Sequence, residues 1–350
     1  SEAIAKGVNY FDTAWPYHGG KAELVIGEIL KQYPRESFYL ADKFPGHQIA
    51  PSYDVKGVFE RQLKKCGVEY FDFYLLHNVY ENSIAVYEDE RWNILPYLLE
   101  QKKNGRIRHL GFSTHAGVPA LEAFLEKHAN EMEFCQIELN YLDWTLQQAK
   151  EKCELLNRYG IPIWVMEPVR GGKLANLPAA AQEKLHALRP EASDASWALR
   201  WVQEIPGVTM ILSGMSNMAQ MQDNLATFDH PEPLSAEERA LLLEIAEGFK
   251  SAVPCTACRY CCDGCPQEID IPQMLRVLNE LRVVPSTNAI MAVEALPKSR
   301  KPQSCLGCGA CTAVCPQKID IPGCMQELTG RIAKLPSWAE ISRQRAAEQP

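Results

Sequence analysis

The stretch VNYFDTAWPY, residues 8–17, sets the pattern that most of the chain repeats. Residues 8–12 are mostly apolar and end in an aspartate, a polar loop follows, and the amphipathic segment AELVIGEILKQY (22–33) comes next. Apolar runs that alternate with longer amphipathic segments are typical of strand–helix units around a parallel sheet. We therefore predict a strand at 8–12, a polar loop after it, and a helix that covers the strand.

Six further apolar runs continue this alternation to about residue 230. They are SFYLAD (37–42), FDFYLL (71–76), IRHLGF (107–112), EFCQIEL (133–139), IPIWVM (161–166) and VTMILS (208–213). Nearly continuous apolar runs are expected for strands that helices cover on both faces. Seven units are one fewer than a closed (β/α)8 TIM barrel requires. We therefore predict an α/β fold, a TIM barrel whose first strand is missing from this chain, which leaves open whether the chain is a fragment lacking its N-terminus.

The composition is that of an ordinary globular protein. The 350 residues are 46% hydrophobic and 23% charged, and the net charge is −8. No apolar run is long enough to span a bilayer, and residues 1–14 lack the charged and apolar regions of a signal peptide. The negative net charge opposes a general attraction to nucleic-acid phosphates. We expect a cytoplasmic protein that binds neither nucleic acid nor membrane.

Thirteen cysteines are many for a chain without an export signal, and ten of them lie between residues 255 and 324. In this segment the pattern CxxCxxCxxxCPQxIDIP occurs twice, at 255–272 and at 305–322. The candidate metal ligands are Cys255, Cys258, Cys261, Cys265, Cys305, Cys308, Cys311 and Cys315. Three thiolates on one tight loop reach three corners of an iron–sulfur cube, and the fourth, before a proline, typically ligates the other cluster. This is the spacing of bacterial two-cluster ferredoxins, so we predict two [4Fe-4S] clusters.

Two alternatives stay open for these cysteines. Paired CxxC units also build zinc sites with four thiolates, although eight ligands in two copies that each end in Cys-Pro favour iron and sulfur. Cys262 follows Cys261 directly and can replace it as a ligand, so the sequence does not decide between them.

The segment between the two copies is helical in pattern. It resembles the helical type of two-cluster ferredoxin module found in respiratory and methanogenic redox enzymes. We therefore expect three parts: a barrel domain with a bridging helix at 1–250, a mostly α-helical two-cluster ferredoxin-like domain at 251–330, and a less ordered tail at 331–350.

Four polar side chains of the first domain lie at or just after the ends of predicted strands. Asp12 ends the run 8–12, and Tyr17 lies in the loop after it. Lys43 and His77 follow the next two runs. Because the active site of such a barrel lies at the C-terminal ends of its strands, these four are candidates for one catalytic site. We expect Lys43 to lower the pKa of Tyr17, Asp12 to hold Lys43, and His77 to hydrogen-bond the substrate oxygen.

The segment GVNYFDTAWPY, the later lysine and the sequence LLHN resemble the aldo/keto reductase family, over roughly residues 1–230. The resemblance implies that a nicotinamide cofactor, NADP or NAD, supplies hydride to a carbonyl substrate, or takes it from an alcohol, while Tyr17 acts as general acid or base. It also implies contacts with that cofactor. These residues are Ser113, Gln136, Met166, Arg170, Ser213, Gly214, Met215 and Asn224.

Departures from the family pattern keep the choice of cofactor open. Thr114 stands where the family commonly has asparagine, and Met166 where it commonly stacks an aromatic ring on the nicotinamide. Residues 213–224 lack the Lys and Arg that usually hold the 2'-phosphate of NADP, although Arg170 and Lys173 could compensate. The family's first strand also has no counterpart here.

The two parts of the chain handle electrons differently, because nicotinamides carry them in pairs and each cluster carries one at a time. The sequence shows no clear signature of a flavin that converts between them. We therefore expect a nicotinamide-dependent carbonyl or alcohol oxidoreductase whose clusters pass electrons to a redox partner protein or serve structure or sensing. The alternative is an iron–sulfur electron-transfer protein that uses the barrel as a docking scaffold. Substrate identity and oligomeric state cannot be deduced from this sequence.

Overall fold

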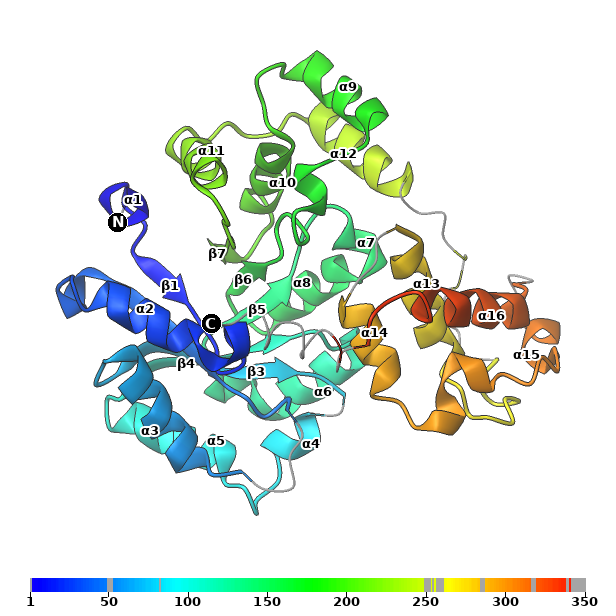
Figure 1. The fold of residues 1–350 in the computed structure, drawn as a ribbon, viewed down its shortest axis with the longest axis horizontal. Helices are drawn as coiled ribbons and strands as arrows, with labels where there is room; N and C mark the ends of the chain where they lie inside the picture. Colours follow the sequence, from blue (N-terminus) through cyan, green and yellow to red (C-terminus); the bar gives the residue numbers. More distant parts are fainter. Residues whose placement is uncertain are drawn as a thin grey trace. The chain divides into compact units, whose positions relative to one another are not determined.

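The chain forms two compact units, Ser1–Leu243 and Glu244–Pro350, in a computed structural model (Figure 1). The structure describes residues 2–48, 53–81, 83–248, 253, 255, 261–283, 287–315, 319–337 and 340. Most of the predicted tail at 331–350 therefore lies outside the described residues.

Seven parallel strands form the sheet of the first unit, and each pairs with the next one in the sequence. They are β1 (Tyr10–Asp12), β2 (Tyr39–Phe44), β3 (Phe71–Val79), β4 (Ile107–Thr114), β5 (Cys135–Glu138), β6 (Ile163–Met166) and β7 (Val208–Ile211). Within the described part of the chain, the series ends at β1 on one side and at β7 on the other, with no ladder between them. The predicted α/β barrel wall of seven units is confirmed.

Helices connect the strands and cover the outside of the sheet. They are α1 (Glu2–Ala5), α2 (Ala22–Leu30), α3 (Val55–Cys66), α4 (Ile84–Tyr87), α5 (Ile94–Lys103), α6 (Val118–His128), α7 (Asp143–Leu146), α8 (Ala149–Arg158), α9 (Ala179–Leu188), α10 (Asp194–Gln203), α11 (Met218–Asp229) and α12 (Ala236–Gly248). Figure 1 shows α2, α3 and α5 side by side along one flank of the sheet, where α3 contacts β2 and α5 contacts β4.

Local sequence explains where the helices begin and end. Asp54 accepts a hydrogen bond from Gly57 N at 2.9 Å and caps the start of α3, which ends at Gly67 in the left-handed conformation. Before α12, Ser235 Oγ accepts from Glu238 N at 3.1 Å while Glu238 Oε2 accepts from Ser235 N at 2.7 Å. This is the reciprocal capping that the sequence predicts for the bridging helix.

Aromatic side chains fill the interior of the barrel wall. Phe134 and Trp164 stack with ring centroids 3.9 Å apart, and Phe73 meets Trp164 edge-on at 4.7 Å. Tyr10 packs against the same cluster from β1. The interior is thus a packed core, as in other barrels of this kind, and the polar residues are left at the C-terminal ends of the strands.

Strands β2 and β3 extend two and three residues further than predicted. Lys43 pairs with Leu75 and Phe44 with Leu76 in the parallel ladder. Lys43 and His77 therefore lie inside strands and not in the loops after them, because backbone pairing continues for as long as the neighbouring strand offers a partner.

The second unit is mostly helical, as predicted. Its helices are α13 (Ile271–Val283), α14 (Thr287–Glu294), α15 (Ala310–Ala313) and α16 (Ile321–Ile332). Met274 and Leu278 of α13 and Met325 and Leu328 of α16 share one buried core. The two helices are also joined by an ion pair, in which Arg282 Nε donates to Glu327 Oε1 at 3.1 Å.

Each copy of the cysteine pattern leads directly into one of these helices through its IDIP sequence. Asp270 Oδ1 accepts from Gln273 N at 3.2 Å, and Asp320 Oδ1 accepts from Gly323 N at 3.1 Å. Pro322 occupies the first turn of α16, where a missing N–H costs no hydrogen bond. The end of the repeated sequence is therefore a helix start. In the part of the chain that the structure describes, no helix is both long and apolar enough to cross a membrane.

Candidate active site and cysteine pocket

Asp12, Tyr17, Lys43 and His77 converge at the C-terminal ends of β1, β2 and β3. Lys43 Nζ pairs with the Asp12 carboxylate and donates to Thr13 O at 2.9 Å. The same ammonium lies 4.9 Å from the centroid of the Tyr17 ring, which meets the His77 ring edge-on at 5.7 Å. The structure thus brings together all four residues that the sequence singled out.

Tyr17 keeps its proton more firmly than the sequence suggests. Burial raises the pKa of Tyr17 above its ordinary value of 10.0, and the Lys43 cation, which also hydrogen-bonds the phenol, opposes this only in part. Asp12 raises the pKa of Tyr17 further. Lys43 therefore lowers the pKa of Tyr17 as expected, but the net pKa is raised because loss of hydration destabilises the phenolate more than one cation stabilises it. Tyr17 is a protonated donor that remains 37% exposed.

Lys43 is positively charged in this site, whereas His77 is neutral. Burial disfavours the charge of Lys43, but Asp12 and Tyr17 outweigh it and raise the pKa of Lys43 above its ordinary value. Burial, with His47 and Lys43 as neighbours, lowers the pKa of His77 well below its ordinary value. The site therefore holds one permanent cation and a neutral imidazole, and a neutral imidazole can donate a hydrogen bond to a carbonyl oxygen.

A second group of predicted residues lies on the next strands. Ser113 of β4 and Gln136 of β5 are register partners, and they are 3% and 2% exposed. Ser113 Oγ accepts from Asn78 N at 2.8 Å, whereas Gln136 Oε1 is buried without a hydrogen-bond partner. A buried acceptor without a donor fits an amide group of a ligand, such as the carboxamide of a nicotinamide. Met166 ends the next strand, β6, and is only partly buried.

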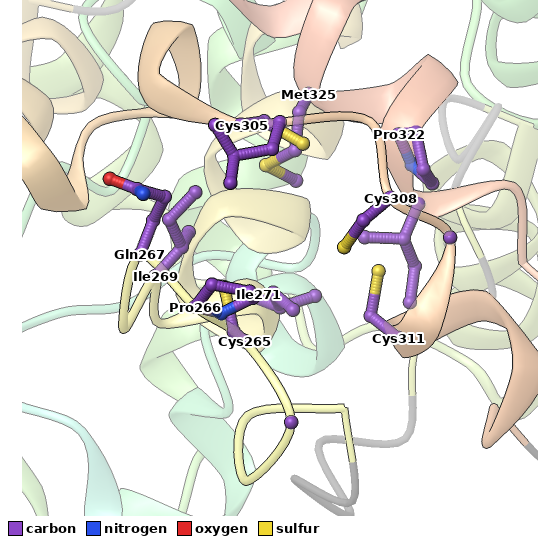
Figure 2. A pocket seen from close by; sticks show the side chains of 14 residues that line it. Cys265, Pro266, Gln267, Ile269, Ile271, Cys305, Cys308, Cys311, Pro322 and Met325 are labelled. Atoms are coloured by element: carbon purple, nitrogen blue, oxygen red, sulfur yellow. The ribbon is translucent and has the colours of Figure 1, made fainter.

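A pocket in the second unit is lined by cysteines of both sequence copies (Figure 2). Cys265 comes from the first copy, and Cys305, Cys308 and Cys311 come from the second. Figure 2 shows the sulfurs of Cys308 and Cys311 turned toward one another. The empty volume is about 390 Å³, open solvent at the mouth included, and the remaining walls are largely apolar, with Ile269, Ile271, Ile321 and Met325 among them.

This pocket brings thiols of both copies around one cavity. Four thiols around a cavity are what a cube with four iron corners requires. The crossing of Cys265 to the second copy is the arrangement that its position before Pro266 predicts.

Comparisons with known proteins agree with both parts of this description. The model of the aldo/keto reductase family matches residues 1–247, which is most of the chain. The chain belongs to the aldo/keto reductase family. A model of the 4Fe-4S dicluster domain matches residues 254–319, so this oxidoreductase carries a ferredoxin-type domain after its barrel.

Curated relatives resemble the barrel part of this aldo/keto reductase. "Probable aldo-keto reductase 1" of Glycine max is 28% identical in an alignment of 277 positions, and the match covers 67% of this chain and 77% of the relative. The NADH-specific methylglyoxal reductase of Escherichia coli is 23% identical in an alignment of 292 positions, and the match covers 71% of this chain and 86% of the relative.

Solved structures show the same fold. The apo form of an aldo-keto reductase from Bacillus halodurans has a TM-score of 0.54 and 22% identity, and the match covers 70% of this chain and 83% of that one. An aldo/keto reductase from Brucella melitensis has a TM-score of 0.56 and 22% identity, with 70% and 87% covered.

The remaining predicted cofactor residues of this aldo/keto reductase lie after β6 and β7. Asn224 Nδ2 donates to Ser213 Oγ at 2.9 Å, which ties α11 to the loop that contains Gly214 and Met215. Arg170 is 7% exposed, and its Nε donates to Asp143 Oδ2 at 2.9 Å. The guanidinium of Arg170 is therefore already bound to a buried carboxyl group, and burial, with Glu138 as neighbour, raises the pKa of that group to about 7.

The first cysteine copy is described only in part, because Cys258 lies outside the described residues. Cys261 is 7% exposed, and its counterpart in the second copy, Cys311, is 9% exposed. Cys262 corresponds to Thr312: Cys265 N donates to Cys262 O at 3.1 Å, and Cys315 N donates to Thr312 O at 3.2 Å. The two copies thus share one turn, which places Cys261 where the second copy has a candidate ligand.

The sequence reasoning missed His47. Its ring lies 4.2 Å from that of His77, and burial lowers the pKa of His47 to about 4. His47 follows Lys43 by four residues, so its position after a strand that carries a candidate catalytic residue was the available signal.

Proposed function

We propose that this aldo/keto reductase reduces a small carbonyl compound, or oxidises the corresponding alcohol, with a nicotinamide cofactor. The observation that carries the proposal is the contact of Tyr17 with both Lys43 and His77 at the C-terminal ends of the strands. A proton donor, a buried cation and a neutral imidazole are the groups that protonation of a carbonyl oxygen needs.

The chemistry divides between the cofactor and the chain. When bound, the nicotinamide supplies hydride to the carbonyl carbon. Tyr17 transfers its hydroxyl proton to the carbonyl oxygen, so that a C–H and an O–H bond form while the C=O bond becomes single. His77 hydrogen-bonds the same oxygen and orients it. Lys43, held by Asp12, stabilises the phenolate that Tyr17 leaves behind.

The buried Gln136 Oε1, which lacks a hydrogen-bond donor and lies beside Ser113, supports binding of the nicotinamide carboxamide at β4 and β5. The loop with Ser213, Gly214 and Met215, tied to Asn224, would hold the rest of the dinucleotide near the start of α11. Because the Arg170 guanidinium is already bound to the buried Asp143, and residues 213–224 contain no Lys or Arg, we infer a preference for NAD over NADP. The KM for NADH should then be lower than that for NADPH.

The ferredoxin-type domain would hold two [4Fe-4S] clusters. Cys308 is exposed, and Leu306 beside it is 65% exposed. A cluster in this pocket would have an edge at the surface of its unit, which favours exchange of single electrons with a redox partner protein over a purely structural or sensing role. The same observation supports the second candidate function, an electron-transfer protein whose barrel is a docking scaffold.

Tyr17→Phe tests the proposed reaction. With methylglyoxal as the trial carbonyl, chosen because a relative is named for it, the variant should lose roughly 100-fold or more in kcat. NADH binding and iron content should be unchanged. If the wild type reduces no carbonyl compound, or if Tyr17→Phe retains the activity, the proposal is wrong.

Anaerobic titration of the iron-loaded protein with NADH tests whether the nicotinamide site and the clusters exchange electrons. Bleaching of the cluster absorbance by NADH alone means that nicotinamide and clusters exchange electrons. Oxidation of NADH only when a carbonyl compound is added, without bleaching, means that hydride transfer in the barrel is independent of the clusters.

A further inference from the structure

Behind the catalytic residues, on the outer face of β2, two carboxyl groups are completely buried. Asp42 precedes Lys43 in β2, and Glu23 belongs to the first turn of α2; both are 0% exposed. Since an isolated buried carboxylate is costly, each of these groups needs partners that offset the loss of hydration.

Asp42 has three donors around it. Its Oδ1 accepts from Lys43 N at 2.8 Å and from Gln62 Nε2 at 2.8 Å, and Cys66 Sγ lies 3.8 Å from Oδ2. Gln62 Nε2 also donates to Lys43 O at 3.0 Å. Asp42 therefore holds the backbone of the strand at the position of the catalytic lysine.

Glu23 is only half satisfied. Its Oε2 accepts from Lys65 Nζ at 2.7 Å, but its Oε1 is buried without a donor from the protein. The Asp42 carboxyl lies within hydrogen-bonding contact of Glu23. Two carboxyl groups in contact satisfy each other only when one of them carries a proton, which supplies the missing donor.

The same network holds the turn that carries Tyr17. Lys65 Nζ donates to Gly20 O at 3.3 Å and lies 4.2 Å from the centroid of the Trp15 ring. Between these two residues, His18 has a backbone φ of 50°. This conformation is unfavourable for any residue other than glycine, so contacts with the surrounding structure must stabilise it. Lys65 thus connects the Tyr17 turn to Glu23, and Glu23 in turn contacts Asp42.

We propose that Asp42 and Glu23 share one proton and act as positioning residues that hold the Tyr17 turn in register with Lys43. The kinetic part of this inference rests on the proposed function of Tyr17, whereas the shared proton is a property of the fold.

The charges around the pair agree with one shared proton. Burial and the neighbouring Glu23 raise the pKa of Asp42 well above its ordinary value of 3.8, and Lys43 opposes this. The groups that face the pair are Lys43 from β2, Gln62, Lys65 and Cys66 from α3, and Tyr74 from β3, whose hydroxyl donates to Gln62. Burial raises the pKa of the Cys66 thiol and of the Tyr74 phenol, so both stay neutral.

The sign of the resulting pH dependence follows from linkage. A carboxyl whose pKa is raised on folding stabilises the folded state fully below its unfolded pKa, and this stabilisation is lost as pH rises through the folded pKa. The folded protein should therefore lose stability as pH rises above the ordinary carboxyl pKa toward the raised pKa of Asp42, and the Tyr17 turn should loosen over the same range.

Glu23→Gln is the decisive variant. The amide can accept from Lys65 and donate to Asp42, so it keeps both contacts without a shared proton. We expect its Tm to fall less between about pH 6 and about pH 9 than that of the wild type. Asp42→Asn should reduce the pH dependence of Tm in the same way, and it replaces Glu23→Gln as the test variant if Glu23→Gln does not fold. Glu28→Gln, on the exposed side of the same helix, should keep the wild-type profile.

Kinetics test the positioning role. Glu23→Ala removes both contacts and should lower kcat for carbonyl reduction roughly 10-fold with little change in KM for NADH, and Glu23→Gln should restore most of it. Wild-type and Glu23→Gln Tm profiles of equal slope would overturn the shared proton. An equal kcat in Glu23→Ala and wild type would overturn the positioning role. If the wild type lacks carbonyl reductase activity, the proposed function fails while the Tm profiles still decide the shared proton.

Discussion

Lys43 keeps a positive charge at a position that is 1% exposed. It can do so because the Asp12 carboxylate and the Thr13 carbonyl accept from its ammonium. A buried charge that loses its only counter-ion destabilises the folded state strongly. The Asp12–Lys43 pair should therefore matter for stability as well as for the reaction.

Lys43→Met should lower the free energy of unfolding by about 3 kcal/mol, because Asp12 and Thr13 O are left without their donor. It should also lower carbonyl reduction at least 100-fold, since no cation remains beside Tyr17. Chemical denaturation and NADH oxidation measure the two effects. Lys31→Met, which removes an exposed cation from the end of α2, is the matched control and should change stability by less than about 0.5 kcal/mol. Equal losses in both variants would contradict the prediction.

His47 and His77 should make the protein sensitive to mild acid. Both have pKa values below the ordinary 6.5, with that of His47 at about 4. Such a group stabilises the fold above its unfolded pKa, and this stabilisation is lost as pH falls toward the folded value. The wild-type Tm should therefore drop between about pH 7 and about pH 4.5, and His47→Gln should drop less. Parallel Tm profiles of the two proteins would rule out a contribution from His47.

The two adjacent thiols Cys261 and Cys262 should behave differently. Cys261 is buried to about the same degree as Cys311, its counterpart in the second copy, whereas the counterpart of Cys262 is Thr312, which is not a cysteine. Cys261→Ser should reduce the iron content from roughly eight to roughly four atoms per chain, and Cys262→Thr should leave it unchanged. Iron analysis with electron paramagnetic resonance of the reduced protein checks both. Loss of iron in Cys262→Thr would assign the ligand to Cys262.

At the scale of elements, α2 and α3 approach each other closely behind β2. A Cβ on Gly27 of α2 would lie 2.6 Å from Lys65 O and 2.7 Å from Cys66 O, which are backbone atoms of α3. Only a glycine permits this approach, because backbone atoms cannot rotate away as a side chain can. The approach also brings Glu23 within reach of Lys65.

Gly27→Ala should therefore push the two helices apart and lower the free energy of unfolding by about 2 kcal/mol. Because α2 follows the Tyr17 turn, kcat should fall as well. Gly330→Ala in α16 is the control: no atom lies within 4 Å of its added Cβ, so the variant should be neutral or slightly more stable. Thermal unfolding and activity are measured for both variants. A Gly27→Ala variant with the stability and kcat of the wild type would show that the two helices can move apart without cost.

At the scale of the whole molecule, the two units are stabilised in different ways. The first has an aromatic barrel core and a continuous sheet. In the second, Cys261 and Cys311 are part of the buried core, and Cys265, Cys305 and Cys315 pack against it. Because these thiols belong to the core itself, cluster assembly and folding of the second unit should be coupled.

Removal of iron by a chelator under reducing conditions should abolish the unfolding transition of the second unit and leave that of the barrel. Differential scanning calorimetry of the iron-loaded and iron-free protein measures this, with NADH binding as the control for an intact barrel. Two unchanged transitions after loss of iron would show that the second unit folds without its clusters.

Much of this protein was readable from the sequence because the relevant signals are local. Seven apolar runs predicted the strands to within a few residues, and the position of Asp12, Lys43 and His77 at the ends of those runs predicted that they meet. The position of Cys265 before a proline predicted its assignment to the second copy, since the fourth cysteine of this spacing ligates the other cluster in two-cluster ferredoxins.

By itself, then, the sequence determined the barrel, the catalytic candidates and the two-cluster module, because periodicity and ligand spacing act over a few residues. Only the tertiary structure decided that burial outweighs Lys43 in setting the pKa of Tyr17, that Asp143 binds Arg170, and that the His47 ring lies against the His77 ring. The contact of Glu23 with Asp42 is of the same kind. These properties depend on exclusion of water and on side chains from separate elements, and neither is encoded in the spacing of residues along the chain.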